Sequence, residues 1–260
     1  MTWRRAAAIV GAGAIGAAAL LPFDGAIVAV MRRFGDGGAW EVGGDLRREL
    51  LFLQQYGAVT SVLIVCAAIF VLDRTRRVRL LDLAAGVLVN ALAVNAIKIL
   101  VGRPRPRFND PLHFSGPFHP YPLVRDVDPI APGVQPGTVW RHSWEVWGDI
   151  SSDLWSMPSS HTAAAMVLSA ALVRLYPALR PLVLVLAVAV AACRVLFTAH
   201  YASDVVVGAA IGWVVGSASM DGRWGTLAVS ALRGRRGGAR GAAAGPSPRT
   251  IQPETPGEAP

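Results

Sequence analysis

Long apolar runs separated by polar residues set the pattern of this sequence. A helix needs about 20 apolar residues to cross a bilayer, and the runs here approach or reach that length. The pattern therefore predicts an all-α, polytopic membrane protein, a six-transmembrane-helix bundle with an external loop carrying short helices. The six predicted spans are Ala6–Leu21, Leu51–Leu72, Leu80–Val101, Thr162–Val173 with a continuation toward Pro177, Pro181–Thr198 and Val205–Met220.

The first apolar run has two interpretations. Arg4 and Arg5 precede an apolar core that ends near Pro22, which is also the form of a cleavable signal peptide. We favour a retained helix, because a protein with several spans needs no cleavable signal.

Composition supports the membrane assignment. Of 260 residues, 53% are hydrophobic and only 16% are charged, and the mean hydropathy is +0.44. The net charge of +8 is compatible with nucleic-acid binding. However, the basic residues cluster beside the apolar runs and in the tail, so membrane topology explains them better and we expect no nucleic-acid partner. Cys66 and Cys193 lie in or beside apolar runs and indicate neither a disulfide framework nor a metal site.

The arginines predict the orientation. They occur at the N-terminus, in the 74–79 loop, in the 174–180 turn and in the C-terminal tail, and six spans put all four segments on one side. The positive-inside rule then places both termini in the cytoplasm of a cell-membrane protein. We expect a membrane domain at 1–222 and a disordered, basic, cytoplasmic tail at 223–260.

The opposite face would carry segments 22–50, 102–158 and 199–203. We expect the first to be an external loop with one short amphipathic helix. In the long second segment, Trp140, Trp144 and Trp147 fall at helical spacing. Tryptophan favours the membrane interface, so these residues indicate either a helix lying on the bilayer surface or ordinary packing beneath a loop.

The polar stretch Cys193–Asp204, with the sequence CRVLFTAHYASD, lies between two apolar runs. Charged groups are costly near a bilayer, so their presence suggests a functional site. On a helix, His200 and Asp204 would share one face, and the carboxylate could orient the imidazole as a nucleophile or base. The alternative is a capped helix start with a surface histidine.

Other polar residues fall on the same predicted face, and the full set consists of Lys98, Arg105, Pro158, Ser159, Ser160, His161, Arg194, His200 and Asp204. Each has a structural explanation alone, such as an interfacial anchor or a helix start, but their joint occurrence on one face favours a site. Three cations and a helix N-terminus suit a phosphoryl group, while one histidine attacks phosphorus and the other protonates the leaving oxygen. No Asp/Glu cluster has the spacing of a Mg²⁺ or Zn²⁺ site, so we expect no metal and no cofactor.

Three motifs in this set resemble the signature of the type 2 phosphatidic acid phosphatase superfamily, which also includes vanadium haloperoxidases. The resemblance covers roughly Leu51 to Met220. The family's K-x6-R-P motif is matched by Lys98, Arg105 and Pro106, its P-S-G-H motif by Pro158–His161, and its S-R-x5-H-x3-D motif by Arg194, His200 and Asp204. Ser160 replaces the usual glycine, and Cys193 replaces the usual serine.

The resemblance implies His200 as the nucleophile that forms a phosphohistidine, Asp204 as the group that fixes its tautomer, and His161 as the general acid. Lys98, Arg105, Arg194, Ser159 and the Ser160 backbone would hold the phosphoryl oxygens. His113, His119 and His142 fall outside the motifs, and we treat them as loop residues.

A site at the outer ends of several spans would meet a phosphate at headgroup depth. The expected activity is therefore metal-independent hydrolysis of a lipid mono- or diphosphate at the extracytoplasmic face. Candidates are a polyprenyl diphosphate, phosphatidic acid, phosphatidylglycerol phosphate and a lipid A phosphate, which the sequence does not distinguish. A lipid phosphotransferase, or a non-catalytic transporter or scaffold, are the alternatives. The apolar spans argue against a haloperoxidase, so we expect vanadate to inhibit.

Overall fold

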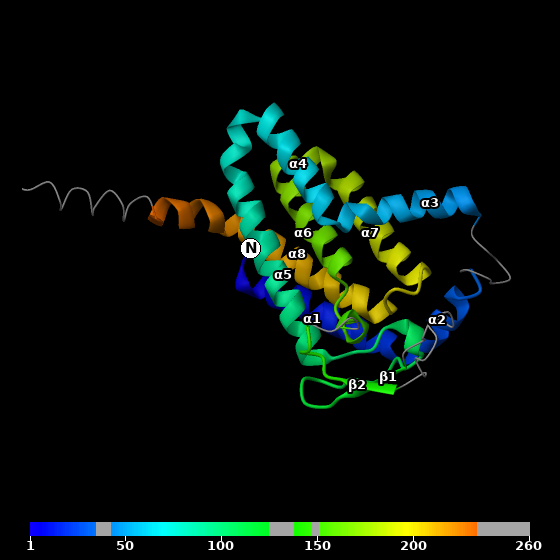
Figure 1. Ribbon diagram of the computed structural model, residues 1–260. Coiled ribbons are helices and arrows are strands. Elements are labelled where there is room, and N and C mark those ends of the chain that lie inside the picture. The colour runs from blue at the N-terminus through cyan, green and yellow to red at the C-terminus, as the bar shows by residue number, and fades with distance from the viewer. Residues whose placement is uncertain (35–42, 125–137, 147–150, 233–260) are drawn as a thin grey trace, which may run out of the picture.

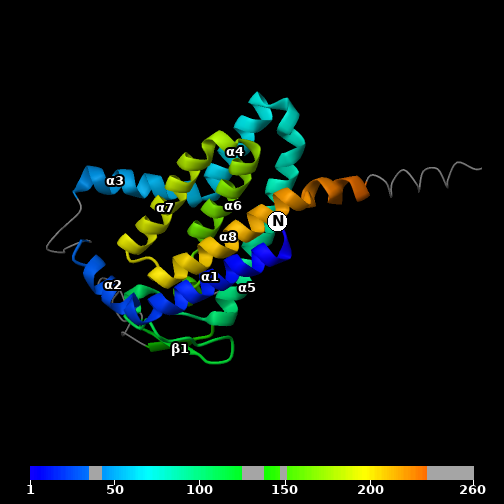
Figure 2. The same cartoon turned by 180° about the vertical axis from the view of Figure 1, so that it is seen from behind.

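The computed structural model describes residues 1–34, 43–124, 138–146 and 151–232. These residues are mostly helical, with one small antiparallel sheet (Figures 1 and 2). The α-helices are α1 (Trp3–Leu20), α2 (Asp24–Met31), α3 (Gly44–Leu53), α4 (Val59–Leu72), α5 (Leu80–Val101), α6 (Ser160–Leu175), α7 (Arg180–Leu196) and α8 (Ala202–Gly222), and the strands are β1 (Tyr121–Val124) and β2 (Thr138–Arg141).

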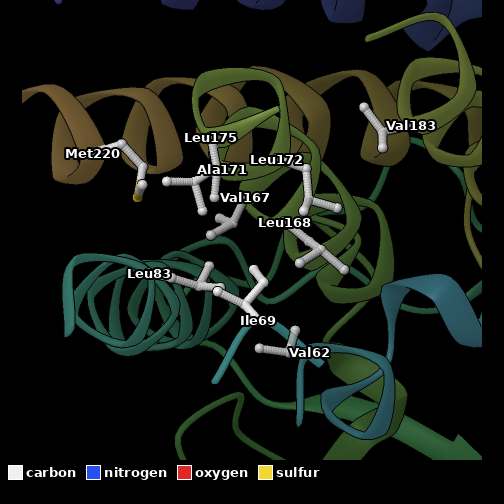
Figure 3. Close-up of a cluster of buried hydrophobic side chains, with 10 residues drawn as sticks. All are labelled: Val62, Ile69, Leu83, Val167, Leu168, Ala171, Leu172, Leu175, Val183 and Met220. Carbon is white, nitrogen blue, oxygen red and sulfur yellow. The ribbon is translucent and has the colours of Figure 1, made fainter. Parts of the chain in front are cut away.

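Helix α6 is the centre of the bundle and packs against α5, α7 and α8. It is rich in alanine and carries buried residues around most of its circumference. The largest apolar cluster surrounds it, where Leu83 of α5, Ile69 of α4 and Met220 of α8 meet Val167 and Leu168 of α6 (Figure 3). Burial of this cluster removes apolar surface from solvent or lipid and fixes α6 relative to its neighbours.

Small residues allow α6 and α8 to approach closely. A Cβ atom added to Gly212 of α8 would lie 2.1 Å from the backbone oxygen of Ala163 on α6. Close backbone approach through glycine is a common way for helices to associate in membranes. The contact continues to the start of both helices, where the N–H of Ser159 donates to the backbone oxygen of Asp204 at 3.1 Å. The packing therefore brings two of the sequence motifs together.

The predicted spans are confirmed in part. Helix α5 has the predicted bounds, and α6, α7 and α8 differ from prediction by a few residues at their ends. Among the described residues, four helical segments are long and apolar enough to cross a membrane: Trp3–Met31, Arg74–Phe108, Pro177–Leu196 and Ala202–Gly222. The bent pair Gly44–Gly57 and Val59–Leu72 raises this number to five, whereas α6 is shorter, at 16 residues. The predicted count of six spans is not confirmed.

The predictions for the first two spans need correction. Helical structure does not end at Leu21, because a 3₁₀ turn at Leu21–Phe23 leads directly into α2. Pro22 occupies the first turn of that 3₁₀ segment, where a proline needs no N–H partner. The second run is not straight either, since α3 and α4 meet at 65° across the 3₁₀ turn Gln54–Gly57. Segment 22–50 is therefore not a loop with one helix, although α3 corresponds to the predicted amphipathic helix.

The predicted interfacial helix in segment 102–158 is wrong for the described residues. Trp140 lies in β2, which pairs with β1 in the register Tyr121↔Arg141 to Val124↔Thr138, and Trp144 lies in a turn. Trp147 lies outside the described residues. Both described tryptophans are exposed, so packing beneath a loop does not explain them either. The buried cluster under the hairpin consists of Tyr121, Leu123 and Leu154.

The end of the bundle formed by the start of α5 and the end of α8 collects ion pairs. The N-terminal amine of Met1 and Arg174 both bind Asp221, and Arg79 binds Asp82. The predicted disorder of the tail is wrong for residues 224–232, which are helical. Thr226 anchors this segment by donating its N–H to Asp82 Oδ1 at 2.8 Å. The rest of the tail, 233–260, lies outside the described residues.

Candidate functional site

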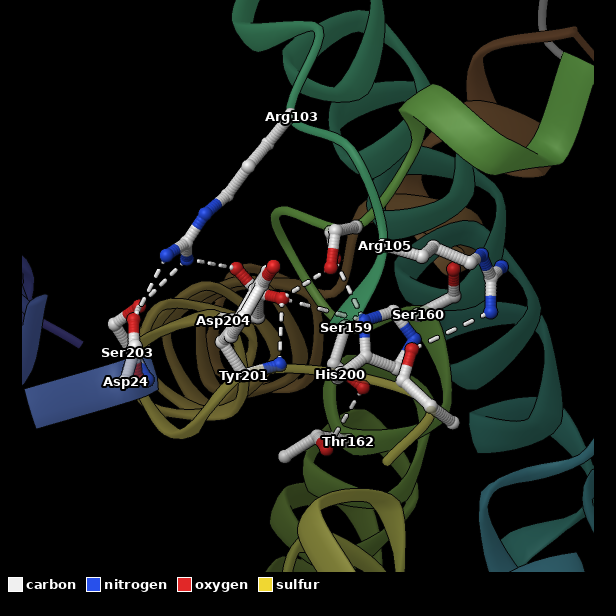
Figure 4. Close-up of polar contacts among 12 residues, drawn as sticks. Asp24, Arg103, Arg105, Ser159, Ser160, Thr162, His200, Tyr201, Ser203 and Asp204 are labelled. Atoms are coloured by element: carbon white, nitrogen blue, oxygen red, sulfur yellow. Dashed lines mark hydrogen bonds and ion pairs between the residues drawn. The ribbon is translucent and has the colours of Figure 1, made fainter. Parts of the chain in front are cut away.

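The sequence-predicted residues meet at the other end of the bundle. Lys98 lies in the last turn of α5, His161 in the first turn of α6 and Arg194 in the last turn of α7. His200 precedes α8, and Asp204 lies in its first turn. Consecutive helices from α5 to α8 alternate in direction, so two C-terminal and two N-terminal ends converge, and the side chains interact electrostatically. Figure 4 shows Arg105, Ser160 and His200 from three of these segments close together.

Lys98 is buried at the edge of this cluster. Its side chain is only 6% exposed, and Nζ donates to the hydroxyl of Ser160 at 2.5 Å. It lies close enough to Arg105 and Arg194 to interact electrostatically with both. Ser160, which replaces the glycine usual in the family motif, thus offers a hydroxyl to the lysine of the first motif.

Arg105 reaches the cluster because α5 ends sharply. Gly102 terminates the helix in the left-handed conformation, with φ +57°, which glycine adopts without strain. The guanidinium of Arg105 then donates from Nε to the backbone oxygen of Ser152 at 2.8 Å and from Nη1 to that of Ala199 at 3.4 Å. These contacts hold it between the loop before α6 and the turn before α8.

The start of α6 has the features of an anion site. The hydroxyl of Ser159 accepts from Thr162 Oγ1 at 3.1 Å and does not cap the helix. The first backbone N–H groups of a helix have no intrahelical acceptor, and the helix dipole favours negative charge there. In the described part of the chain, the N–H groups of Ser160, His161 and Thr162 have no backbone acceptor. They point to the end of the bundle that holds the three cations.

The geometry of His200 identifies its reactive nitrogen. The ring is 2% exposed, and Nδ1 lies 2.7 Å from the backbone oxygen of Ser156. A carbonyl oxygen only accepts, so Nδ1 carries the proton and Nε2 of the neutral ring has a free lone pair. Burial lowers the pKa of His200 to about 4, and Arg105 and Arg194 act in the same direction, against the opposing effect of Asp204. The ring is therefore neutral at physiological pH.

The predicted partner of His200 needs correction. Asp204 Oδ2 lies 3.6 Å from Nδ1, too far for a direct hydrogen bond. The carbonyl of Ser156 fixes the tautomer instead. Asp204 accepts from the Ser156 hydroxyl at 2.5 Å and from the N–H of Tyr201 at 2.9 Å. Its carboxylate therefore acts on His200 electrostatically and through Ser156.

His161 lies on the other side of the cluster. Its imidazole interacts electrostatically with Arg194, His200, Lys98 and Arg105. Its ring has no hydrogen-bond partner among the residues that the structure describes, which leaves both nitrogens available to a bound molecule. The backbone of His161 packs closely against Gly57, where an added Cβ would lie 2.3 Å from the His161 oxygen.

Arg194 has a partner that sequence reasoning missed. Its Nη1 donates to Gln54 Oε1 at 3.0 Å, from the 3₁₀ turn between α3 and α4. Nε of the same guanidinium is buried, and no acceptor for it is found within residues 1–34, 43–124, 138–146 and 151–232. Unpaired buried donors are rare in proteins, and here the donor lies in the cationic cluster. The polar pair Gln54-Gln55 within an apolar run was the available sequence signal.

A second missed group lies behind Asp204. Arg103 is fully buried and donates from Nη1 to Asp204 Oδ1 at 2.6 Å and from Nη2 to Asp24 Oδ2 at 2.8 Å. The extra arginine in the stretch GRPRPR, and a single aspartate following the first apolar run, were its signals in the sequence.

No hydrogen bond or ion pair within the described residues links the remaining candidates to the cluster. The sulfur of Cys193 is buried in α7. His113 contacts Ser115, and His142 contacts Glu145, both within segment 102–158. His119 lies in the same segment and is exposed. In the part of the chain that the structure describes, no three His, Cys, Asp or Glu side chains form a group that could hold a metal ion.

Comparison with known proteins decides the family. The profile of the PAP2 superfamily matches residues 79–226, more than half of the chain. The chain belongs to the PAP2 superfamily. The match contains every residue predicted from the motifs, whereas Asp24 and Gln54 lie before it.

Two further comparisons complete the picture. A solved structure described as the first transmembrane PAP2-type phosphatidylglycerolphosphate phosphatase, from Bacillus subtilis, is similar with a TM-score of 0.49 and 19% identity, over 84% of this chain and 94% of the other. No curated protein matches. Membership of the PAP2 superfamily, a phosphatase family, supports a phosphatase activity for this apolar, membrane-type chain.

Proposed function

We propose that this PAP2 protein is an integral-membrane, metal-independent lipid phosphate phosphatase that works through a phosphohistidine on His200. One observation carries the proposal: the Nδ1 proton of a buried, neutral imidazole is held by the Ser156 carbonyl. The nitrogen with the lone pair, Nε2, is then the one available for attack. A nucleophile in a fixed tautomer beside several cations suits attack on a phosphoryl group.

The cations and the α6 start would hold the phosphoryl oxygens. Lys98, Arg105 and Arg194 supply three positive charges, and Ser159 and Ser160 lie at the start of α6, where the N–H of Ser160 has no backbone acceptor among the described residues. Charge on the equatorial oxygens grows or redistributes in the transition state, so donors fixed in advance stabilise it. The unpaired Nε of Arg194 is one donor that a phosphate oxygen would satisfy.

The reaction would proceed in two steps. Nε2 of His200 attacks phosphorus, an N–P bond forms, and the P–O bond to the lipid breaks. The electron pair goes to the lipid oxygen, which takes a proton from His161 acting as general acid. Water then attacks phosphorus as His161 takes its proton, the N–P bond breaks, and inorganic phosphate leaves.

The position of the cluster supports a lipid substrate. It lies where four helices end, so a phosphate bound there would stand at headgroup depth while its tail stays among apolar helices. The ion pairs of Arg79 and Arg174 lie at the opposite end, together with the N-terminal amine. With the positive-inside rule, this arrangement supports a site facing the periplasmic or extracellular side and cytoplasmic termini. Substrates to test are farnesyl diphosphate, phosphatidic acid, phosphatidylglycerol phosphate and a lipid A phosphate.

The test is phosphate release by the purified full chain in detergent with EDTA. Wild type should hydrolyse at least one member of the panel, and His200→Ala should lose activity by three orders of magnitude or more, since no nucleophile remains. His142→Ala is the matched control, because His142 is bound to Glu145 outside the cluster, and it should retain activity. Equal release by wild type and His200→Ala would point to a non-catalytic lipid-phosphate transporter or scaffold.

The acceptor needs a separate measurement. Adding a lipid alcohol to the same assay distinguishes water from another phosphoryl acceptor. Release of free phosphate should remain the main reaction, whereas quantitative transfer to the alcohol would identify a lipid phosphotransferase acting through the same residues.

A further inference from the structure

A buried ion-pair network lies behind the proposed nucleophile and extends to α2, which follows the first apolar helix. Its members are Asp24, Arg103, Ser203 and Asp204, and each is 0% exposed (Figure 4). They come from the start of α2, from the loop after α5 and from the first turn of α8. Burial of two carboxylates and one guanidinium is costly unless the geometry is good, so a specific arrangement is being maintained.

Arg103 uses its whole guanidinium fork. Nη1 donates to Asp204 Oδ1 at 2.6 Å and to the Ser203 hydroxyl at 2.7 Å, and Nη2 donates to Asp24 Oδ2 at 2.8 Å. Nε donates to the backbone oxygen of Pro111 at 3.1 Å. The ring of Tyr201 lies under the guanidinium at 4.1 Å. Any rotation of the Arg103 side chain would therefore break at least one of these contacts.

Asp24 holds the other side of the network. Its Oδ1 accepts from the N–H of Ser203 at 3.1 Å, and its Oδ2 accepts from the Ser203 hydroxyl as well as from Arg103. The start of α8 is therefore tied to the joint between the first apolar helix and α2. Cleavage of the first apolar run near Pro22 would separate Asp24 from the helix that precedes it.

The network reaches His200 through Asp204 and Ser156. With Oδ1 occupied by Arg103, the carboxylate of Asp204 is oriented so that Oδ2 accepts from the Ser156 hydroxyl. The backbone of Ser156 is also tied to Arg103, since its N–H donates to the Arg103 oxygen at 3.0 Å. The carbonyl of Ser156 then holds Nδ1 of His200. Arg103 thus determines where the acceptor for the nucleophile's proton lies.

The charge of the network also matters. Attack by Nε2 while Nδ1 keeps its proton leaves a positive charge on the imidazole. Arg103 and Asp204 alone would cancel each other, and Asp24 adds the second carboxylate that makes the network negative. A buried negative group near the ring stabilises the charge that develops in the attack.

We propose that Asp24 and Arg103 are positioning residues for His200, so that the start of α2 helps to orient the proposed nucleophile. The proposal rests on the proposed function, because it assumes that His200 is the nucleophile. A merely structural ion pair would contribute to stability and leave bonding to His200 unchanged.

Orthovanadate tests the proposal without knowledge of the lipid. Vanadate becomes five-coordinate by bonding to a nucleophile, whereas inorganic phosphate binds through charge and hydrogen bonds alone. Asp24→Asn keeps the side-chain shape and removes the second carboxylate. Calorimetric titration of the full chain in detergent should show vanadate binding weakened about ten- to hundredfold, the range expected when a reacting group is displaced, and phosphate binding changed by less than about threefold.

Asp82→Asn is the matched control. Asp82 is also 0% exposed, pairs with Arg79 and accepts from Thr226, but it lies at the other end of α5. It should lower thermal stability as Asp24→Asn does and leave the Kd of both anions unchanged. If both variants weaken vanadate binding equally, or if neither does, the positioning role is wrong.

Two further variants complete the test. Arg103→Lys keeps the charge but cannot serve Asp24 and Asp204 together, so it should reproduce the selective loss of vanadate binding even if Asp24→Asn fails to fold. His200→Ala should bind vanadate no more tightly than phosphate. If His200→Ala keeps the wild-type preference for vanadate, the proposed function fails. If it loses that preference while Asp24→Asn and Arg103→Lys keep it, only the positioning role fails.

Discussion

Protonation of His200 should couple the stability of this protein to pH in a way that one substitution removes. His200 lies in the connection between α7 and α8, is 2% exposed, and has its pKa lowered by burial to about 4 from an ordinary value of 6.5. Between pH 6.5 and pH 4, His200 binds a proton in the unfolded chain but not in the folded chain. The folded state should therefore be most stable above pH 6.5 and lose stability as the pH falls toward 4.

The magnitude follows from the two pKa values. They differ by about 2.5 pH units, and one unit corresponds to about 1.36 kcal/mol. His200 should therefore lower the free energy of unfolding by about 3 kcal/mol between pH 6.5 and pH 4. For a chain of this size that corresponds to a Tm lower by roughly 10 °C. Carboxylates elsewhere also titrate in this range, so the wild-type curve alone does not isolate the histidine.

His200→Asn supplies the comparison. Its side-chain amide can still donate to the Ser156 carbonyl, but it does not titrate. Thermal unfolding in detergent, followed by tryptophan fluorescence between pH 4 and pH 8, should show a steeper acid loss for wild type than for His200→Asn. Parallel curves for the two proteins would refute the buried, neutral histidine that the proposed mechanism requires.

Three other outcomes are expected. The profile of kcat/KM against pH should be bell-shaped, because His200 must be neutral and His161 charged, and both limbs should lie below pH 6.5 because burial lowers the pKa of both histidines; a flat profile would count against these roles. Gln54→Ala should weaken phosphate binding about tenfold in titration calorimetry, since Arg194 loses its hydrogen bond, whereas the exposed neighbour Gln55 should tolerate alanine. Gly212→Ala should lower the free energy of unfolding by about 1–3 kcal/mol, seen as a lower Tm, because its Cβ would overlap the Ala163 backbone. Gly11→Ala should leave the Tm unchanged, because nothing lies within 4 Å of its Cβ position, and equal Tm changes would contradict the packing argument.

Local patterns in the sequence were sufficient for several elements. The run Leu80–Val101 is a helix with the predicted bounds, because a long apolar run with only isolated polar residues, followed by Gly102, carries both its length and its stop signal. The motif spacings predicted that Lys98, Arg105, His161 and His200 lie on one face, and in the structure all four lie in or beside the ends of α5, α6 and α8. Residues four apart on a helix, or at the same helix terminus, lie close together because of the helix geometry alone.

Other features depended on contacts between distant segments. The 65° bend at Gln54–Gly57 divides a run that is apolar on both sides, and it exists where Gly57 packs on His161 and Gln54 reaches Arg194. The strand containing Trp140 likewise depends on its partner β1. Periodicity describes one segment at a time and carries no information about such pairings.

The sequence by itself determined the apolar helices, the three motifs and the residue types of the cationic cluster. Only the tertiary structure decided that Ser156, rather than Asp204, accepts the proton-bearing nitrogen of His200, and that Asp24 and Arg103 stand behind it. The physical reason is that a hydrogen-bond partner is selected by distance and direction at the angstrom scale. Those quantities are set by how α1, α5, α6 and α8 pack against one another, and spacing along the chain does not contain them.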